Sequence, residues 1–284
     1  MPATAEASAP CATGADALAC WRLRHEPFYQ PVGDEVNAFD AAAACRLPVL
    51  LKGPTGCGKT RFVEHMAWRL QRPLVTVACH EDLSAGDLAG RWLLDAQGTH
   101  WQDGPLALAA RHGAICYLDE LVEARADATV LLHPLADTRR VLPLERRGEL
   151  LNAHPDFLLV VSYNPGYQGL HKALKPSMRQ RFTALQFDYP EPAQEAAVVA
   201  READADPALA RQLVALGQRT RRLQDHGLEE GASTRMLVHA AALVRAGLSP
   251  GAAALQAVAT PLSDEPGLQR TLHALVEAVF GPVA

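Results

Sequence analysis

One short stretch of the sequence has the residue types that bind phosphate. It reads Gly53-Pro54-Thr55-Gly56-Cys57-Gly58-Lys59-Thr60 and satisfies the pattern G-x-x-x-x-G-K-S/T, after a strand-like run and before a helix-like one. Glycines lack Cβ atoms, so successive backbone N–H groups can turn inward on phosphate oxygens, and a helix that begins near Lys59 directs its positive dipole end to the same place. The stretch therefore predicts a phosphate-binding loop; the alternative is a tight turn with an ordinary surface lysine.

The side chains of this loop predict ATP and Mg²⁺ as its ligands. Lys59 would reach the β and γ phosphates, and Thr60 would offer its hydroxyl to Mg²⁺, which neutralises charge shared between those phosphates. We expect the nucleotide to contact the loop from Gly53 to Thr60 and also the next residue, Arg61.

Two adjacent carboxylates follow an apolar run in "AICYLDE" and predict hydrolysis rather than binding alone. They are Asp119 and Glu120, placed at the carboxyl end of a buried strand, where ligands of open α/β sheets bind. We expect Asp119 to hold Mg²⁺ through its water shell, and Glu120 to polarise the attacking water as general base.

Three further polar residues could complete such a site. Asn164 follows the apolar run "LLVVSY" and could bridge the attacking water and the γ-phosphate, or it could cap the turn before Pro165. Arg181, with Arg179 as second choice, could stabilise charge on the phosphoryl oxygens, and a neighbouring subunit can donate such a residue. A surface salt bridge is the alternative role for either arginine.

A fourth candidate, Arg235, lies in the first turn of a predicted helix that Ser233 or Thr234 could cap. A cation at that position opposes the helix dipole, so a nearby anion would offset an unfavourable placement. Bound nucleotide would supply that anion; the alternative is a solvated arginine.

The elements that would position these residues fall into two parts. Short Val, Leu and Ile runs alternate with helix-like segments up to residue 189, and continuous apolar runs are typical of strands covered on both faces. Beyond Pro190 and Pro192, which fit a linker, Ala, Leu, Val and Arg recur with helical spacing. We therefore expect a disordered tail over 1–20, an α/β core with a parallel sheet between helices over 21–189, and an all-α lid over 190–284.

Two β-hairpins are expected in addition to the sheet. The first, in residues 90–104, would turn near Gln97-Gly98 and carries Trp92 and Trp101, which could grip a partner or pack under a neighbouring helix. The second, in residues 138–157, has a basic edge that could be a solvated face, a subunit contact or a surface for an acidic partner. Its arginines are Arg139, Arg140, Arg146 and Arg147.

Composition narrows the class of protein. The 284 residues include 27 Lys and Arg against 32 Asp and Glu, a net charge of −5, so no overall basic field would attract nucleic acid. The six cysteines show no paired short spacing, and His80, His112 and His133 are scattered, so we expect reduced thiols and no metal site other than Mg²⁺. Because no apolar run approaches the ~20 residues of a membrane span and no signal peptide is evident, we expect a cytoplasmic protein without a membrane span.

The order of these motifs resembles AAA+ ATPases, which are P-loop NTPases, and in particular the MoxR group. The runs "LPVLLKGPTGCGKTRFVEHMAWRL", "VACHEDLSAGDLAGRWLL", "GAICYLDELVEAR" and "VVSYNPGYQ", followed by "MRQRF" and "STR", look like the CbbQ/NorQ family. The likeness covers about residues 27 to 260 and fades over the first twenty residues and the final helices.

This resemblance implies a hexameric ring that works with a partner carrying a von Willebrand factor A domain, of the CbbO/NorD type. In CbbQ-like systems the pair reactivates inhibited Rubisco, and in NorQ-like systems it matures nitric oxide reductase. We favour Rubisco as the client on general likeness. By the same resemblance the hairpin of residues 90–104 is an insertion that would project toward the pore of the ring.

Three functions follow from these observations. The first is an ATP-driven motor that remodels a protein client. The second is a nucleic-acid motor or loader, which the acidic balance disfavours. The third is a small-molecule kinase, which would need no arginine from a neighbour and would be fully active as a monomer.

Overall fold

The computed structural model describes residues 18–96, 98–165 and 174–282, and the chain divides into two compact units. The first unit comprises residues 34–52 and 60–186 with the described part of the chain before residue 30. The second combines residues 30–33, 53–59 and 187–284, so the predicted phosphate loop is grouped with the C-terminal segment. Of the tail expected over 1–20, residues 1–17 lie outside the described residues, whereas Leu18 is buried in the core of the first unit.

A five-stranded parallel sheet forms the centre of the first unit, in the order β2-β5-β8-β1-β9. The strands are β1 Val49–Lys52, β2 Leu74–Ala78, β5 Ile115–Asp119, β8 Leu158–Tyr163 and β9 Thr183–Gln186. Leu118 of β5 is in register with Val161 of β8, and Lys52 of β1 with Tyr163. The carboxyl ends of β5, β8 and β1 therefore lie side by side, which is where the predicted site residues follow.

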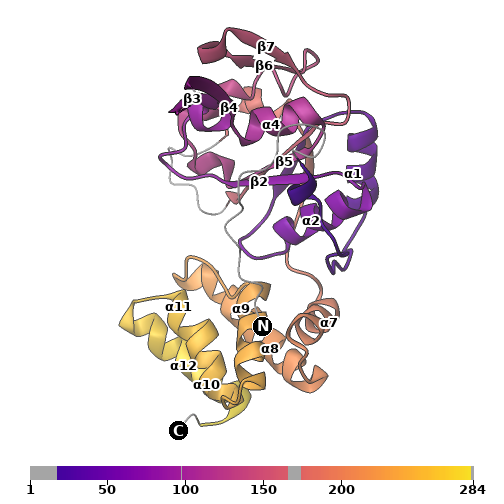
Figure 1. The fold of residues 1–284 in the computed structure, drawn as a ribbon. Coiled ribbons are helices and arrows are strands. Elements are labelled where there is room, and N and C mark those ends of the chain that lie inside the picture. Colours follow the sequence, from indigo (N-terminus) through magenta and orange to yellow (C-terminus); the bar gives the residue numbers. More distant parts are fainter. Residues whose placement is uncertain (1–17, 97, 166–173, 283–284) are drawn as a thin grey trace. The chain divides into compact units, whose positions relative to one another are not determined.

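Helices cover both faces of this sheet, as the continuous apolar runs predict. Figure 1 shows α4 (Pro105–His112) on one side and α1 (Glu35–Ala44) and α2 (Lys59–Arg69) on the other. Because strand side chains alternate between faces, Leu50 joins the cluster formed with α4, and Leu51 is directed to the opposite face. The short helical segments are α3 Ala85–Ala89, α5 Ala126–Leu131, α6 Pro176–Arg179, η1 Ala19–Trp21, η2 Leu121–Glu123 and η3 Glu145–Arg147.

The first predicted hairpin is present as β3 (Gly90–Asp95) paired antiparallel with β4 (Gly98–Asp103). Gln97, named for its turn, lies outside the described residues. Trp92 and Trp101 stand opposite each other with ring centroids 5.5 Å apart in an edge-on arrangement. The Trp92 ring nitrogen donates to the carbonyl of Arg146 at 2.9 Å, and the residue is 51% exposed. The two rings thus pack on each other.

The second hairpin pairs β6 (Val141–Leu144) with β7 (Glu149–Asn152), but its basic edge is only partly a solvated face. The Arg140 guanidinium donates to three backbone carbonyls and serves as an internal anchor. Those carbonyls belong to Arg46, His154 and Phe157. Arg147 forms an ion pair with Glu149 at 2.9 Å. The planar arginine guanidinium has five N–H donors and suits such multiple contacts. The number of arginines in a segment does not predict contacts of this kind.

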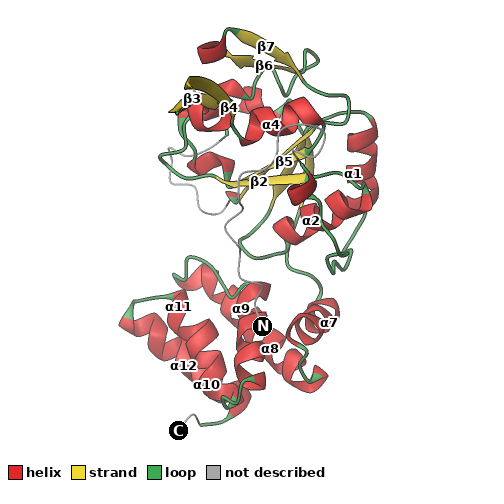
Figure 2. Cartoon of the chain, viewed as in Figure 1, coloured by secondary structure: helices red, strands yellow, loops and turns green. Residues whose placement is uncertain are grey.

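The described residues of the second unit form helices joined by turns and loops (Figure 2). The helices are α7 Pro192–Ala203, α8 Pro207–Arg221, η5 Arg222–His226, α9 Thr234–Arg245, α10 Pro250–Ala254, the π-helical η6 Leu255–Ala259, α11 Thr260–Leu262 and α12 Pro266–Phe280. Several begin with proline, whose missing N–H needs no partner there; Pro192 accordingly opens α7 instead of extending a linker. Ser233, one of the two predicted caps, accepts a hydrogen bond from the Met236 amide at the start of α9. Among the described helices, none has the length and apolar character needed to cross a membrane.

Candidate active site

The predicted phosphate loop connects β1 to α2 and contains glycines that its backbone conformation requires. Gly56 has φ +65° and Gly58 has φ +101°, values that residues with a Cβ rarely adopt. A Cβ added at Gly56 would lie 2.7 Å from the Cβ of Ser233, whereas one at Gly58 would meet nothing within 4 Å. Gly56 is therefore needed for both conformation and space, and Gly58 leaves room beside the loop.

Lys59 is the first residue of α2 and is only 9% exposed. Its ammonium group donates to the carbonyl oxygens of Gly53 at 2.8 Å and Pro54 at 2.7 Å. Within the part of the chain that the structure describes, it forms no ion pair. An ammonium group has three donors and a buried one is unfavourable without an opposite charge. The side chain therefore suits an anion bound in the loop, as a nucleotide phosphate would be.

Thr60 and Asp119, the two predicted magnesium ligands, lie together in the first unit. The Thr60 hydroxyl oxygen is 3.5 Å from Oδ2 of Asp119, which ends β5. A hydroxyl and a carboxylate are hard oxygen ligands of the kind that Mg²⁺ prefers, with its remaining positions filled by water and phosphate. The donor set thus fits the metal that the sequence predicts.

The other oxygen of Asp119, Oδ1, accepts two hydrogen bonds that the sequence analysis missed. The Tyr117 hydroxyl donates at 2.6 Å and the Ser162 hydroxyl at 2.5 Å. Burial, followed by the charge of Asp119, raises the pKa of Tyr117, so the phenol remains a donor. The period of two along a strand places Tyr117 on the same face as Asp119, and this is the one local signal that could have identified it.

Glu120 and Asn164 follow neighbouring strands at the same edge of the sheet. Glu120 has a left-handed backbone with φ +56°, and its amide donates to the Ser162 hydroxyl oxygen at 3.0 Å. The Glu120 side chain is exposed. Asn164 directly follows β8 and is half-buried. The pairing of β5 with β8 therefore brings the Glu120 carboxylate and the Asn164 amide to the same edge of the sheet, at the carboxyl ends of the two strands.

The two arginines near α6 are not part of this cluster. Arg179 ends α6 and is exposed. Arg181 donates through its guanidinium to the carbonyl of Ser177, while its Nε is buried without a hydrogen-bond partner among the described residues. Their assignment to the site of a neighbouring subunit stays a prediction.

Arg235 lies close to the phosphate loop within the second unit. A Cβ added at Gly56 would be 3.4 Å from the Cβ of Arg235, which is exposed in the first turn of α9. A nucleotide in the loop could therefore supply the anion that the position of Arg235 favours. Arg61, by contrast, is exposed and forms an ion pair with Glu64 at 3.1 Å.

Two side chains from the second unit hold the backbone of Thr55, the third residue of the loop. The Thr55 amide donates to the Glu230 carboxylate at 3.0 Å, and the Tyr189 hydroxyl donates to the Thr55 carbonyl at 3.1 Å. Burial, followed by the charge of Glu230, raises the pKa of Tyr189, which keeps this hydroxyl protonated. We call Glu230, Tyr189 and the Arg221 side chain beneath them the loop clasp.

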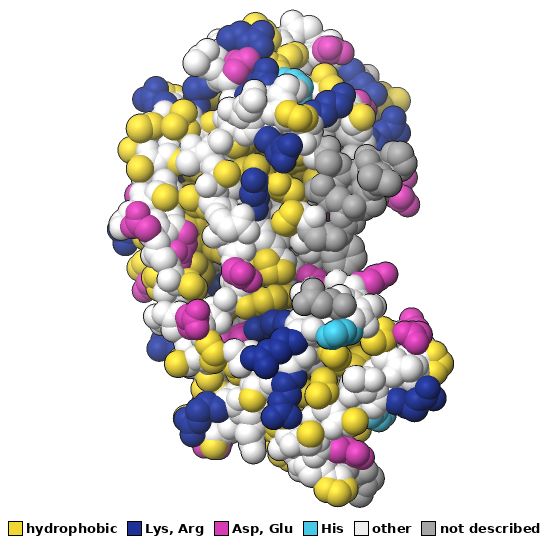
Figure 3. Space-filling view, turned by 180° about the vertical axis from the view of Figure 1, so that it is seen from behind, with side chains coloured by type: hydrophobic (Ala, Val, Ile, Leu, Met, Phe, Trp, Pro, Cys, Tyr) yellow, Lys and Arg dark blue, Asp and Glu magenta, His cyan; other side chains and the backbone are white. Residues whose placement is uncertain are grey.

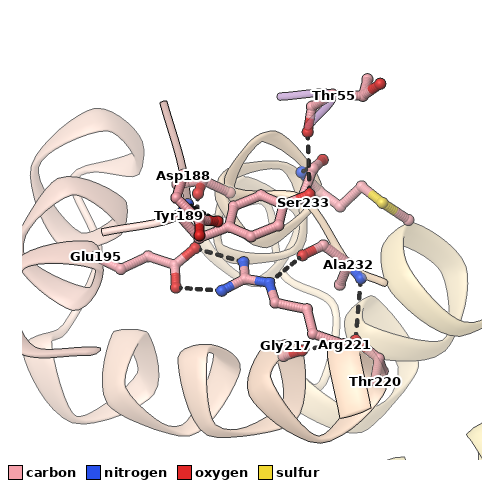
Figure 4. Close-up of polar contacts among 11 residues, drawn as sticks. Thr55, Asp188, Tyr189, Glu195, Gly217, Thr220, Arg221, Ala232 and Ser233 are labelled. Carbon is pink, nitrogen blue, oxygen red and sulfur yellow. Dashed lines mark hydrogen bonds and ion pairs between the residues drawn. The ribbon is translucent and has the colours of Figure 1, made fainter. Parts of the chain in front are cut away.

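Arg221 is the base of the loop clasp. Its guanidinium lies 3.6 Å from the centre of the Tyr189 ring and donates to the Glu195 carboxylate at 2.8 and 2.6 Å. Its Nε donates to the carbonyl of Ala232 at 2.9 Å, so Arg221 stands between these groups in Figure 4. Glu195 is fully buried and also accepts from the Thr234 hydroxyl at 2.6 Å. These partners are far apart in the sequence, and no local pattern indicated them.

Two family models match the chain in succession. The AAA domain (dynein-related subfamily) matches residues 48–182, and the CbbQ/NirQ/NorQ C-terminal domain matches residues 195–279. Among solved structures, two mutants of RuvB from Thermotoga maritima align with TM-scores of 0.55 and 0.52 at 18% identity. They cover 92% and 89% of this chain and 76% and 72% of theirs. This likeness confirms the predicted AAA+ fold with its helical C-terminal region.

Relatives match nearly the whole length of the chain. NirQ of Stutzerimonas stutzeri, a denitrification regulatory protein, is 61% identical, over 89% of this chain and 91% of its own. NorQ of Paracoccus denitrificans is 59% identical, over 90% and 94%. CbbQ of Hydrogenophilus thermoluteolus is 56% identical, over 91% and 97%. The resemblance predicted from the motifs is thus confirmed, and the chain belongs to the CbbQ/NirQ/NorQ family of AAA+ ATPases.

Proposed function

We propose that this ATPase is a MoxR-type motor subunit that uses the energy of ATP hydrolysis to remodel a protein client. One observation carries the hydrolytic part of this proposal. The Thr60 hydroxyl and the Asp119 carboxylate, two hard oxygen ligands, stand 3.5 Å apart where β5 ends and α2 begins. When bound, Mg²⁺ would neutralise charge on the β and γ phosphates.

The residues of the loop would bind and orient the triphosphate. Backbone amides from Gly53 to Thr60 would donate to phosphate oxygens, with Arg61 beside them. Lys59 would exchange its bonds to the carbonyls of Gly53 and Pro54 for bonds to the β and γ phosphates, which gives its buried charge a partner. The Thr60 hydroxyl would contact the metal, and Asp119 would hold it through water.

The residues at the sheet edge would then activate and place the attacking water. Glu120 would accept a proton from that water as general base, and the Asn164 amide would orient the water toward the γ-phosphate. Arg235 would sense the phosphate from the first turn of α9. Arg181, with Arg179 in reserve, would complete the site of the next subunit, which requires a ring; we propose a hexamer.

The client is a protein in this proposal. A partner with a von Willebrand factor A domain, of the CbbO/NorD type, would present it, and inhibited Rubisco is the first candidate from the likeness of the motifs. Nitric oxide reductase is the second candidate, and it is retained because the chain is 61% identical to a NirQ and 59% identical to a NorQ, against 56% to a CbbQ. We place this activity in the cytoplasm.

The net charge of −5 favours a protein client over nucleic acid. On the face shown in Figure 3, basic side chains form a small group on the second unit, with acidic and hydrophobic side chains around it. Nucleic-acid motors use basic grooves that track the phosphate backbone. We expect no salt-sensitive affinity for single- or double-stranded DNA in the micromolar range; finding it would favour the nucleic-acid motor instead.

Glu120→Gln tests the hydrolytic assignment because it removes the base and keeps the size and hydrogen-bonding capacity of the side chain. We expect the variant to retain ATP and to lose phosphate release. Glu81→Gln, which changes an exposed carboxylate after β2, is the matched control and should turn over normally. Undiminished turnover by the Glu120 variant would remove this residue from the role of base.

A second experiment separates the two clients. The ATPase rate is measured with a von Willebrand factor A-domain partner and either inhibited Rubisco or immature nitric oxide reductase. The true client should raise the rate and recover its own activity only when ATP is hydrolysed, so the Glu120→Gln variant should fail with it. Activation by neither client would exclude both, and full activity of a strictly monomeric species would favour a kinase-like enzyme.

A further inference from the structure

We propose that Ser162 and Tyr117 are positioning residues that turn the Asp119 carboxylate so that Oδ2 alone faces Thr60 and the magnesium site. The inference rests on the proposed role of Asp119 as a ligand of hydrated Mg²⁺. It adds two residues to the site that neither the phosphate-loop pattern nor the "LDE" run contains.

The two hydroxyls use the full accepting capacity of one carboxylate oxygen. A carboxylate oxygen offers about two lone-pair sites, and Oδ1 of Asp119 accepts from Tyr117 at 2.6 Å and from Ser162 at 2.5 Å. Both distances are in the short range of charge-assisted O–H···O⁻ bonds, which are stronger than neutral ones. The opposite oxygen, Oδ2, is the one 3.5 Å from the Thr60 hydroxyl. Rotation of the carboxylate would break both short bonds.

Burial makes these bonds effective in fixing the side chain. The tyrosine and the serine both have 0% exposure, so water has little access to replace either donor. The Tyr117 ring is rigid and shares its strand and face with Asp119, whereas Ser162 reaches the carboxylate from the neighbouring strand β8. Donors that come from two strands of one sheet fix the carboxylate in two directions. Such supporting contacts commonly change metal affinity when they are removed.

Ser162 has a further contact, with the backbone of Glu120. Its oxygen accepts from the amide of Glu120 at 3.0 Å, and Glu120 has the left-handed φ of +56°. A non-glycine residue keeps such a conformation only when its surroundings hold it. The serine hydroxyl thus joins the side chain of Asp119 to the backbone of Glu120, and Asn164 follows two residues later on the same chain segment.

Substitutions at Tyr117 and Ser162 should therefore have different effects on magnesium affinity and on kcat. Tyr117→Phe removes one donor to Asp119. It should raise the Mg²⁺ concentration needed for half-maximal tightening of nucleotide binding about 10-fold, the lower end of what supporting contacts contribute to metal affinity. Ser162→Ala should raise this Mg²⁺ concentration at least as much. It should also lower kcat at saturating Mg²⁺, because the backbone amide of Glu120 loses its acceptor. Ser162→Thr keeps the hydroxyl and a strand-compatible side chain, and it should recover most of both.

The experiment titrates a fluorescent ATP analogue into the full chain at a series of Mg²⁺ concentrations and without Mg²⁺. We expect both variants to match wild type without the metal and to need more of it for half-maximal tightening. Tyr163→Phe is the matched control, since Tyr163 is a buried tyrosine at the end of β8. It should retain the wild-type midpoint. Circular dichroism verifies that each protein folds, and the phenylalanine variant, which removes one oxygen atom, is the one least expected to disturb packing.

Asp119→Asn separates failure of this inference from failure of the proposed function. If that variant keeps a normal Mg²⁺ response, the assignment of Asp119 as a magnesium residue is wrong. If it loses the response while Tyr117→Phe and Ser162→Ala keep the wild-type midpoint, the positioning role is overturned and the function stands. Equal loss of analogue binding with and without Mg²⁺ in the hydroxyl variants would also overturn it, because that result indicates general damage to the loop.

Discussion

Replacing Arg221 with methionine should destabilise the second unit more than any other single change at the loop clasp. Glu195 has 0% side-chain exposure and Arg221 15%, so solvent screens their interaction little. Methionine keeps the apolar length of the side chain but leaves the Glu195 carboxylate buried, with the Thr234 hydroxyl as the one donor that remains among the described residues. Removing one partner of a buried pair costs about 3–5 kcal/mol. Since one hydrogen bond to Glu195 remains, we expect the free energy of unfolding to fall by about 3 kcal/mol.

Urea unfolding can assign this loss to the right unit. The four tryptophans are Trp21, Trp68, Trp92 and Trp101, and all of them lie outside residues 187–284. Tryptophan fluorescence therefore follows the first unit, whereas circular dichroism at 222 nm also follows the helices of the second. With a typical urea slope of about 1–3 kcal/mol/M, Arg221→Met should give an early dichroism transition at least ~1 M below the wild-type one. The fluorescence transition should move less.

Two companion variants make the test specific. Arg219→Met changes an exposed arginine on the same helix and should alter stability by no more than ~0.5 kcal/mol. The double variant with Glu195→Met removes both charges and should recover much of the loss, because no buried charge is left unpaired. A cost below ~1 kcal/mol for Arg221→Met, or a double variant as unstable as the single one, would refute this reasoning.

Three shorter predictions concern the loop and the neighbouring subunit. Gly56→Ala should weaken ATP binding and cost about 1–2 kcal/mol for its left-handed backbone, because the new Cβ would approach Ser233 at 2.7 Å; an unchanged rise in melting temperature with ATP would contradict this. Arg181→Ala mixed with wild type should lower ATPase activity below the simple average, and an average value would argue against donation across an interface. Burial, opposed by the charge of Lys59, raises the pKa of the Cys57 thiol, so this thiol ionises at a higher pH than a free cysteine does. Iodoacetamide at pH 8 should therefore react more slowly with Cys57 than with the exposed Cys45, and equal rates would contradict the raised pKa.

Local sequence patterns were sufficient to place the residues that lie on one short segment. Gly56, Gly58 and Lys59 could be placed because a strand, a tight loop and a helix follow one another without interruption. Asp119 and Glu120 could be placed because a buried strand delivers whatever follows it to the edge of the sheet. The order of these motifs indicated the resemblance to AAA+ proteins, and the family comparison confirmed that resemblance.

Contacts between distant segments could not be predicted in the same way. Thr55 and Glu230 are 175 positions apart, and Ser162 reaches Asp119 from another strand. Sequence periodicity gives the face of an element but not the partner that covers it. For the same reason Arg140 looked like part of a solvated basic edge, although its guanidinium binds three backbone carbonyls. Such roles depend on the packing of whole elements.

The left-handed backbone of Glu120 has a consequence for engineering. An L-residue in that region costs roughly 1–2 kcal/mol relative to a right-handed one, and glycine adopts it without strain. Glu120→Gly should therefore melt no lower than wild type, although it lacks the carboxylate. A screen that ranks variants by heat resistance would favour an inactive enzyme at this position, so thermostabilised forms must be selected for turnover as well.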